Sequence, residues 1–226
     1  MAAPGFSAGT LRFLRGLDKN NSKAWFDAHR DEYEAELLEP AKVFVEVLGS
    51  KLHSFAPRAV DEPRINGSIR RLNRDLRFSK DKRPYKNYLD LNFPEGRSDM
   101  GMCGVSFFIR VTPKSLMLGA GSHIFAPDKL KAYRRAVLDD TKGKTIAALV
   151  NTLTKAGYSV GGCTFAKPPR GVPADHPRGT LLRHDGLYAY LECPVEENAI
   201  GAKLVAESAK HFKKLHPLNE WLLASI

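Results

Sequence analysis

Hydrophobic residues recur at helical spacing through the first fifty residues of the chain. Asn20 and Asn21 are favourable N-cap residues, and they predict a long helix over about 22–38 that should stop near Pro40. The large apolar side chains of that helix share one face, so this face should pack on a core. The same spacing predicts two further helices, over about 11–17 and 41–54.

The middle of the chain alternates between apolar and polar residues, which is the pattern of β-strands. This alternation predicts strands over 71–79, 88–93, 105–111 and 116–118, with a turn at 112–114. The short connections favour an antiparallel meander. The rest of the chain predicts helices at about 127–138, 145–156, 179–183 and 199–215, and a strand at 187–193.

Strands grouped between helices indicate an α+β fold, with a central, mainly antiparallel sheet flanked by N-terminal and C-terminal helices. We expect a single domain over residues 1–226, with residues 1–10 as a flexible N-terminal segment. A chain of this length can bury a stable core without a metal or a disulfide.

Composition excludes several classes of protein. With 43% hydrophobic and 27% charged residues, the chain is neither disordered nor fibrous. Its longest stretch without Asp, Glu, Lys or Arg, Ser115–Pro127, is too short to span a membrane, and Met1–Thr10 lacks the features of a signal peptide. The three cysteines are widely spaced and no cofactor or metal-ligand motif occurs, so we expect a cytoplasmic protein without cofactor or metal.

The formal net charge of +10 is distributed unevenly along the chain. Residues 27–62 carry nine acidic and four basic residues, whereas residues 64–86 carry nine basic and two acidic residues, a net of +7. So basic a segment should attract an anion. The alternative is that it packs near the acidic helix or is simply solvated.

A strand over 71–79 would sort the charges of this segment onto two faces. Arg74 would share the apolar face with Leu72 and Leu76, where a charge is costly unless a carboxylate or a bound anion meets it. The opposite face would carry Arg71, Asn73, Asp75, Arg77 and Ser79.

The turn that follows, residues 79–86, has the chemistry of an anion site. Ser79 and Asp81 can organise the backbone, and Pro84 stiffens it. Lys82, Tyr85 and Lys86 supply hydrogen-bond donors suited to a phosphate or a carboxylate.

His29 lies in the middle of the apolar face of the predicted helix over 22–38. It is either a core histidine or a site residue that faces the basic strand, where its charge could switch near neutral pH. The remaining histidines lack the i, i+4 spacing of a zinc site.

Three blocks of the sequence resemble a family of uncharacterised proteins from bacteria and fungi, a domain of unknown function. The resemblance covers nearly the whole chain, and it implies no activity, cofactor or catalytic residue. The blocks are Asn20-Asn21-x-x-x-Trp25-Phe26-x-x-His29-Arg30-x-x-Tyr33, then Arg74-Asp75-x-Arg77-Phe78-Ser79-x-Asp81-Lys82-x-Pro84-Tyr85-Lys86, and Pro169-Arg170-Gly171-Val172-Pro173-Ala174-Asp175-His176-Pro177 followed by Leu181-Leu182-Arg183.

Three hypotheses follow from these observations. The first is a basic pocket for a small phosphate- or carboxylate-bearing ligand, in which Asp75, Asp81 or His29 would carry a proton if the site were catalytic. The second is a nucleic-acid or protein interaction module on the same surface. The third is a purely structural ion-pair network; oligomeric state and reaction stay open. The candidate site residues are Asn21, His29, Arg30, Arg71, Arg74, Asp75, Arg77, Ser79, Asp81, Lys82, Tyr85, Lys86, His176 and Arg183.

Overall fold

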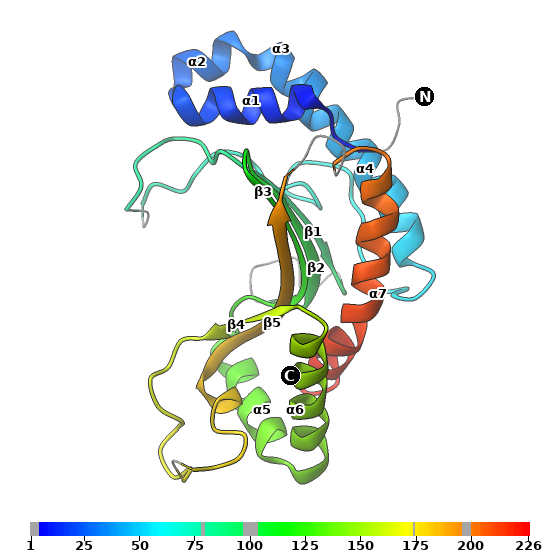
Figure 1. Cartoon of the computed structure of the whole chain (residues 1–226). Coiled ribbons are helices and arrows are strands. Elements are labelled where there is room, and N and C mark those ends of the chain that lie inside the picture. Colours follow the sequence, from blue (N-terminus) through cyan, green and yellow to red (C-terminus); the bar gives the residue numbers. More distant parts are fainter. Residues whose placement is uncertain (1–4, 78–79, 97–103, 174, 196–199) are drawn as a thin grey trace. The chain divides into compact units, whose positions relative to one another are not determined.

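The computed structural model of the chain describes residues 5–77, 80–96, 104–173, 175–195 and 200–226. It confirms the α+β class, with helices toward both ends of the chain and a five-stranded antiparallel sheet (Figure 1). The strand order is β1-β2-β3-β5-β4. The strands are β1 (Leu89–Pro94), β2 (Ser106–Val111), β3 (Ser115–Ser122), β4 (Ser159–Cys163) and β5 (His184–Pro194).

The chain divides into two compact units, and the boundary between them falls within β1, β2, β3, β5 and the last helix, α7 (Lys203–Leu223). Unit 1 comprises Met1–Phe93, Phe108–Leu118 and Glu192–Lys210. Unit 2 comprises Pro94–Phe107, Gly119–Leu191 and His211–Ile226. The single domain over residues 1–226 stays a prediction.

The N-terminal helices of unit 1 correct the prediction of one long helix over 22–38. The helical path is interrupted at His29, whose φ of −116° and ψ of 25° are not helical. It then continues through Pro40 instead of stopping there. The elements are α1 (Ala8–Lys19), α2 (Lys23–Ala28), α3 (Arg30–Tyr33), the π-helical segment η1 (Glu34–Leu38) and α4 (Glu39–Leu52).

Pro40 is tolerated because the backbone around it has other partners. Proline lacks the N–H that would bond to the carbonyl of residue 36. The Thr10 hydroxyl donates to the Glu36 carbonyl oxygen at 2.6 Å instead. The preceding turn is widened, since the Glu39 N–H bonds to the Glu34 carbonyl, five residues back. Thr10 thereby links α1 to η1.

Aromatic side chains build the core between these helices. The Phe13 ring of α1 lies 5.7 Å from Trp25, 6.3 Å from Phe26 and 5.9 Å from Tyr33, measured between centroids. These contacts place α1 beside α2 and α3 (Figure 1). Residues 5–10 were expected within a flexible segment, but Phe6 is buried and the Ser7 hydroxyl caps α1.

The prediction of a strand over 71–79 is wrong for its described residues, 71–77. In place of a continuous ladder, residues 71–77 form one isolated bridge, Asn73 to Tyr85, which follows an earlier bridge from Ile69 to Leu91. The extended path ends at Asp75, whose carboxylate accepts the Arg77 backbone N–H at 3.1 Å and so turns the chain. The predicted two faces of a strand therefore do not form.

In unit 2, helices α5 (Pro127–Leu138) and α6 (Asp140–Lys155) lie against each other and α6 contacts β4 (Figure 1). The carboxylate of Asp139 caps α6 by accepting the N–H groups of residues 141 and 142, so this helix begins five residues before its predicted start. The buried Tyr133 hydroxyl donates to the Leu181 carbonyl at 2.9 Å, which joins α5 to the segment before β5.

The last helix, α7 (Lys203–Leu223), runs eight residues beyond its predicted end. Pro217 lies inside this helix and does not end it. Its C-terminal part belongs to unit 2, where it encloses the buried carboxylate of Glu95. Asn219 Nδ2 donates to Glu95 Oε1 at 2.8 Å, and His216 Nε2 lies 3.6 Å from Glu95 Oε2. These contacts tie α7 to the residue that follows β1.

Candidate anion-binding face

The basic segment 64–86 lies along β1 and the residues that precede it. The Arg70 N–H donates to the Asp90 carbonyl at 2.9 Å, and the Lys86 N–H donates to the Leu72 carbonyl at 2.8 Å. The first bond occupies a backbone group at the edge of β1, and the second joins two parts of the basic segment. They also bring cationic side chains from both parts of the segment close to the strand.

Asn21 anchors the basic segment to the loop between α1 and α2. Its side chain donates to the Tyr85 carbonyl at 3.0 Å and accepts the Tyr85 N–H at 3.0 Å. The buried Tyr85 ring stacks on Phe26 with centroids 4.4 Å apart. Asn21 and Tyr85, two predicted ligand-binding residues, are therefore bonded to each other.

Arg74 has a carboxylate partner, one of the two alternatives, a carboxylate or a bound anion, that the sequence left open. Its side chain is only 17% exposed, and Nη2 lies 3.3 Å from Asp81 Oδ2 and 3.4 Å from the Tyr85 carbonyl. Asp81 also binds the guanidinium of Arg83, which reaches Asp18 of α1 at 3.1 Å. This network holds the turn to the first helix.

Two Asp-x-Arg triplets in the segment adopt the same arrangement. Asp75 accepts both the backbone N–H and the guanidinium of Arg77, and Asp81 does the same with Arg83. The side-chain bond from the arginine is the main cause that lowers the pKa of each carboxyl, to about 2. Both acids are thus charged partners for neighbouring arginines at neutral pH.

Most charged side chains described in the turn over residues 75–83 already have a partner within the protein. Lys82 Nζ donates to the Leu76 carbonyl at 3.2 Å, from an exposed position. Ser79 lies outside the described residues, so its predicted role stays a prediction. The predicted anion site around residues 75–83 therefore consists, among its described residues, mostly of groups that already have internal partners.

The predicted site residues His29 and Arg30 contact side chains and backbone of the preceding helix, α2. The His29 ring stacks on Trp25 with centroids 4.0 Å apart, and Nδ1 lies 2.8 Å from the Trp25 carbonyl. Arg30 lies 3.5 Å from Asp27 and 5.7 Å above the centre of the Phe26 ring. Within the described part of the chain, these contacts are therefore to α2 and not to the basic segment.

His176 and Arg183 belong to unit 2, whereas the other predicted residues belong to unit 1. His176 Nδ1 accepts the Arg178 backbone N–H at 3.1 Å. Arg183 Nε donates to the Phe165 carbonyl at 2.8 Å. Both side chains thus bond to nearby loop backbone.

A cluster of cations surrounds Asp90 and Tyr88 on the side of β1 opposite its buried residues, and we name it the basic face. Leu89, Leu91 and Phe93 point into the core, so Tyr88 and Asp90 point the other way. The basic face consists of Arg70, Arg71, Lys86, Tyr88, Asp90 and Arg110.

Arg110 of β2 is held at two places on this face. Its Nε and Nη2 donate to the two carboxylate oxygens of Asp90 at 2.6 and 3.0 Å, a bidentate pair. Its guanidinium carbon also lies 4.1 Å from the centre of the Tyr88 ring. Glu192 adds a second, more distant negative charge near Arg110.

Lys86 is the cation of this face with the least favourable surroundings. Burial lowers the pKa of its ammonium group; Asp90 opposes this, while Arg110, Arg70 and Arg71 lower the pKa further. Its Nζ lies 6.0 Å from the centre of the Tyr88 ring. An anion bound beside Lys86 would offset this repulsion and raise the pKa again.

Sequence reasoning identified Arg71 and Lys86 of this face but missed Arg70, Tyr88, Asp90 and Arg110. The signal for Tyr88 and Asp90 was present, since they alternate with the apolar residues of β1. Arg110 likewise lies between the buried Ile109 and Val111 of β2. Only the pairing of β1 with β2 brings Arg110 to Asp90.

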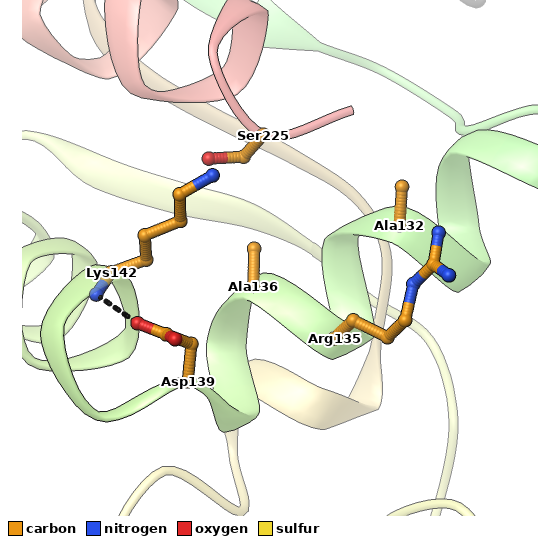
Figure 2. Close-up of a pocket in the computed structure, with 6 residues that line it drawn as sticks. All are labelled: Ala132, Arg135, Ala136, Asp139, Lys142 and Ser225. Carbon is orange, nitrogen blue, oxygen red and sulfur yellow. Dashed lines mark hydrogen bonds between the residues drawn. The ribbon is translucent and has the colours of Figure 1, made fainter.

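A depression lies in unit 2, between α5, α6 and the C-terminal residues (Figure 2). The Asp139 carboxylate accepts the Lys142 backbone N–H, and the Lys142 side chain extends away from it toward Ser225 (Figure 2). Lys142 Nζ donates to the Ala224 carbonyl at 3.2 Å. Because these polar groups link secondary-structure elements, the depression is a weaker candidate than the basic face. Its remaining lining residues are Ala132, Arg135, Ala136 and Ser225.

The described part of the chain has neither a cluster of metal-ligating side chains nor a membrane-spanning helix. Three or more His, Cys, Asp or Glu side chains do not gather there in an arrangement that could hold a metal ion. None of the helices described is both long enough and apolar enough to cross a membrane.

Comparison with known proteins identifies the family of the chain. A search of curated proteins found no match. Residues 9–221, which include all three motif blocks and every residue of the basic face, match the family described as conserved hypothetical protein (DUF2461). The chain therefore belongs to the DUF2461 family of conserved hypothetical proteins.

Proposed function

We propose that this protein binds a small anion, a phosphate or a carboxylate, at the basic face. The observation that carries the proposal is the position of Lys86, a partly buried ammonium group close to three guanidinium groups. The carboxylate nearest to it, that of Asp90, already accepts two hydrogen bonds from Arg110.

The balance of charge on this surface favours an anion. Arg70, Arg71, Lys86 and Arg110 contribute four positive charges, against which stand Asp90 and the more distant Glu192. Asp75 also lies near Arg71, but Arg77 holds that carboxylate with two side-chain bonds. The excess positive charge gives a field that attracts and retains an anion.

The turn at residues 75–83 has a supporting role in this proposal. Its arginines are engaged with Asp75, Asp81 and Asp18, which orders the segment that carries Arg71 and Lys86. The ion-pair network, our structural hypothesis for the motif, and the anion site are therefore compatible: the network holds the segment, and the basic face binds the ligand.

Calorimetric titration with inorganic phosphate and pyrophosphate at low ionic strength tests the proposal. The Lys86→Met variant keeps the aliphatic stem and removes the charge, so affinity should fall by about tenfold, as expected for the loss of one charge-assisted hydrogen bond. Lys213→Met, at an exposed position of α7, changes the net charge equally and should bind as the wild type does.

Two results would overturn the proposal. One is the absence of measurable phosphate or pyrophosphate binding by the wild type. The other is an equal affinity of the wild type, the Lys86→Met variant and the Lys213→Met control, which would indicate diffuse attraction to net charge. Circular dichroism of each variant verifies that it is folded.

A further inference from the structure

The guanidinium of Arg110 is fixed in a way that an ordinary phosphate-binding arginine is not. Nε and Nη2 donate hydrogen bonds to Asp90, so this edge of the guanidinium is not available for a bidentate contact with a phosphate. The Tyr88 ring lies against one face of the guanidinium, 4.1 Å from its carbon. Two independent contacts therefore set both the orientation and the plane of this group.

The side chain of Arg110 is nevertheless 40% exposed, compared with 21% for its partner Asp90. Asp90 binds one edge of the guanidinium and Tyr88 lies on one side of it, so neither of these contacts involves the opposite face or Nη1. A flat guanidinium face is a surface on which nucleobases stack in protein complexes. Its charge adds a cation–π attraction to that stacking.

Groups suited to a phosphate lie around the same tyrosine ring. Lys86 Nζ is 6.0 Å from the Tyr88 centroid, and Arg71 is close enough to Lys86 to affect its ionisation. The planar guanidinium of Arg110 and the ammonium group of Lys86 thus both lie near the Tyr88 ring. A ligand with an aromatic base and a phosphate joined by a single sugar has the matching chemistry.

We propose that the anion bound at the basic face is a nucleotide, whose base stacks on Arg110 and whose phosphate is held by Lys86 and Arg71. This inference rests on the proposed anion-binding function and specifies its ligand class. The nucleotide could be free or part of a single strand, because both present a base beside a phosphate.

Calorimetric titration with adenosine monophosphate and with ribose 5-phosphate isolates the contribution of the base, because the two ligands carry the same phosphate and sugar. Adenosine monophosphate should bind about tenfold more tightly, which corresponds to stacking of one base. A single-stranded hexanucleotide and its abasic counterpart repeat the comparison for a strand. A preference for either form of nucleotide supports the inference and identifies its source.

The Arg110→Lys variant keeps the positive charge and removes the planar guanidinium on which the base would stack. It should lose the roughly tenfold advantage of adenosine monophosphate while it still binds ribose 5-phosphate. The Tyr88→Leu variant, which removes the support beneath the guanidinium, should weaken the same advantage. It provides a second test if Arg110→Lys does not fold.

The outcomes separate the two proposals. If the wild type bound adenosine monophosphate no better than ribose 5-phosphate, and the hexanucleotide no better than its abasic counterpart, the nucleotide would be refuted and the anion site would stand. Failure of both ligands and of inorganic phosphate to bind would overturn both proposals. If folded Arg110→Lys and Tyr88→Leu variants kept the full advantage of the base, the stacking role of Arg110 would be wrong.

Discussion

Replacing Asn21 with alanine tests whether the first motif block holds the basic segment in place. The Asn21 side chain bonds to both backbone groups of Tyr85 at 3.0 Å. A neutral intramolecular hydrogen bond contributes about 0.5–1.5 kcal/mol, so the loss of two should lower the free energy of unfolding by about 1–3 kcal/mol. For a chain of this size, a loss of 2 kcal/mol corresponds to a decrease in Tm of roughly 4–8 °C.

Asn20→Ala is the matched control, because it makes the same chemical change at the neighbouring residue. Asn20 donates one exposed hydrogen bond, to the Gly16 carbonyl at 3.1 Å. Its loss should change the free energy of unfolding by about 0.5 kcal/mol or less. Urea unfolding followed by circular dichroism measures both variants.

Amide hydrogen exchange gives a local readout for the same prediction. The Tyr85 N–H donates to Asn21, so exchange of this amide should accelerate in the Asn21→Ala variant and not in Asn20→Ala. If Asn21→Ala is no less stable than Asn20→Ala and Tyr85 exchanges at the wild-type rate, the anchoring role of Asn21 is refuted.

Two further predictions concern stability and pH. Thr10→Val removes the hydroxyl that donates to the Glu36 carbonyl at 2.6 Å, so the free energy of unfolding in urea should fall by about 1–3 kcal/mol. For the control Thr145→Val, on the exposed face of α6, it should fall by about 0.5 kcal/mol or less. Equal losses would contradict the role of Thr10. The pKa of Asp81, about 2 in the folded protein, lies below its usual 3.8, so its stabilising effect is complete above pH 3.8 and is lost as the pH falls toward 2. Arg83→Gln should move the Asp81 pKa upward in a carbon-detected NMR titration, and an unchanged pKa would show that Arg83 is not its main partner.

The sequence alone predicted those features that depend on local pattern. Helical spacing indicated the N-terminal helices, and alternation indicated β1 and β2, because the side-chain period of each element is written directly in the residues. The expectation that Arg74 needs either a carboxylate or a bound anion is met by Asp81, since the cost of burying an unpaired charge holds in any fold.

The tertiary structure decided which groups meet. Periodicity could not reveal that Asp75 turns the chain, because this depends on one carboxylate accepting a backbone N–H two residues later. Nor could it place Arg110 beside Asp90, since these two residues, twenty positions apart in the sequence, are brought together only by strand pairing. The composition of the basic face therefore follows from long-range contacts, whereas the excess of positive charge in residues 64–86 is a property of the sequence itself.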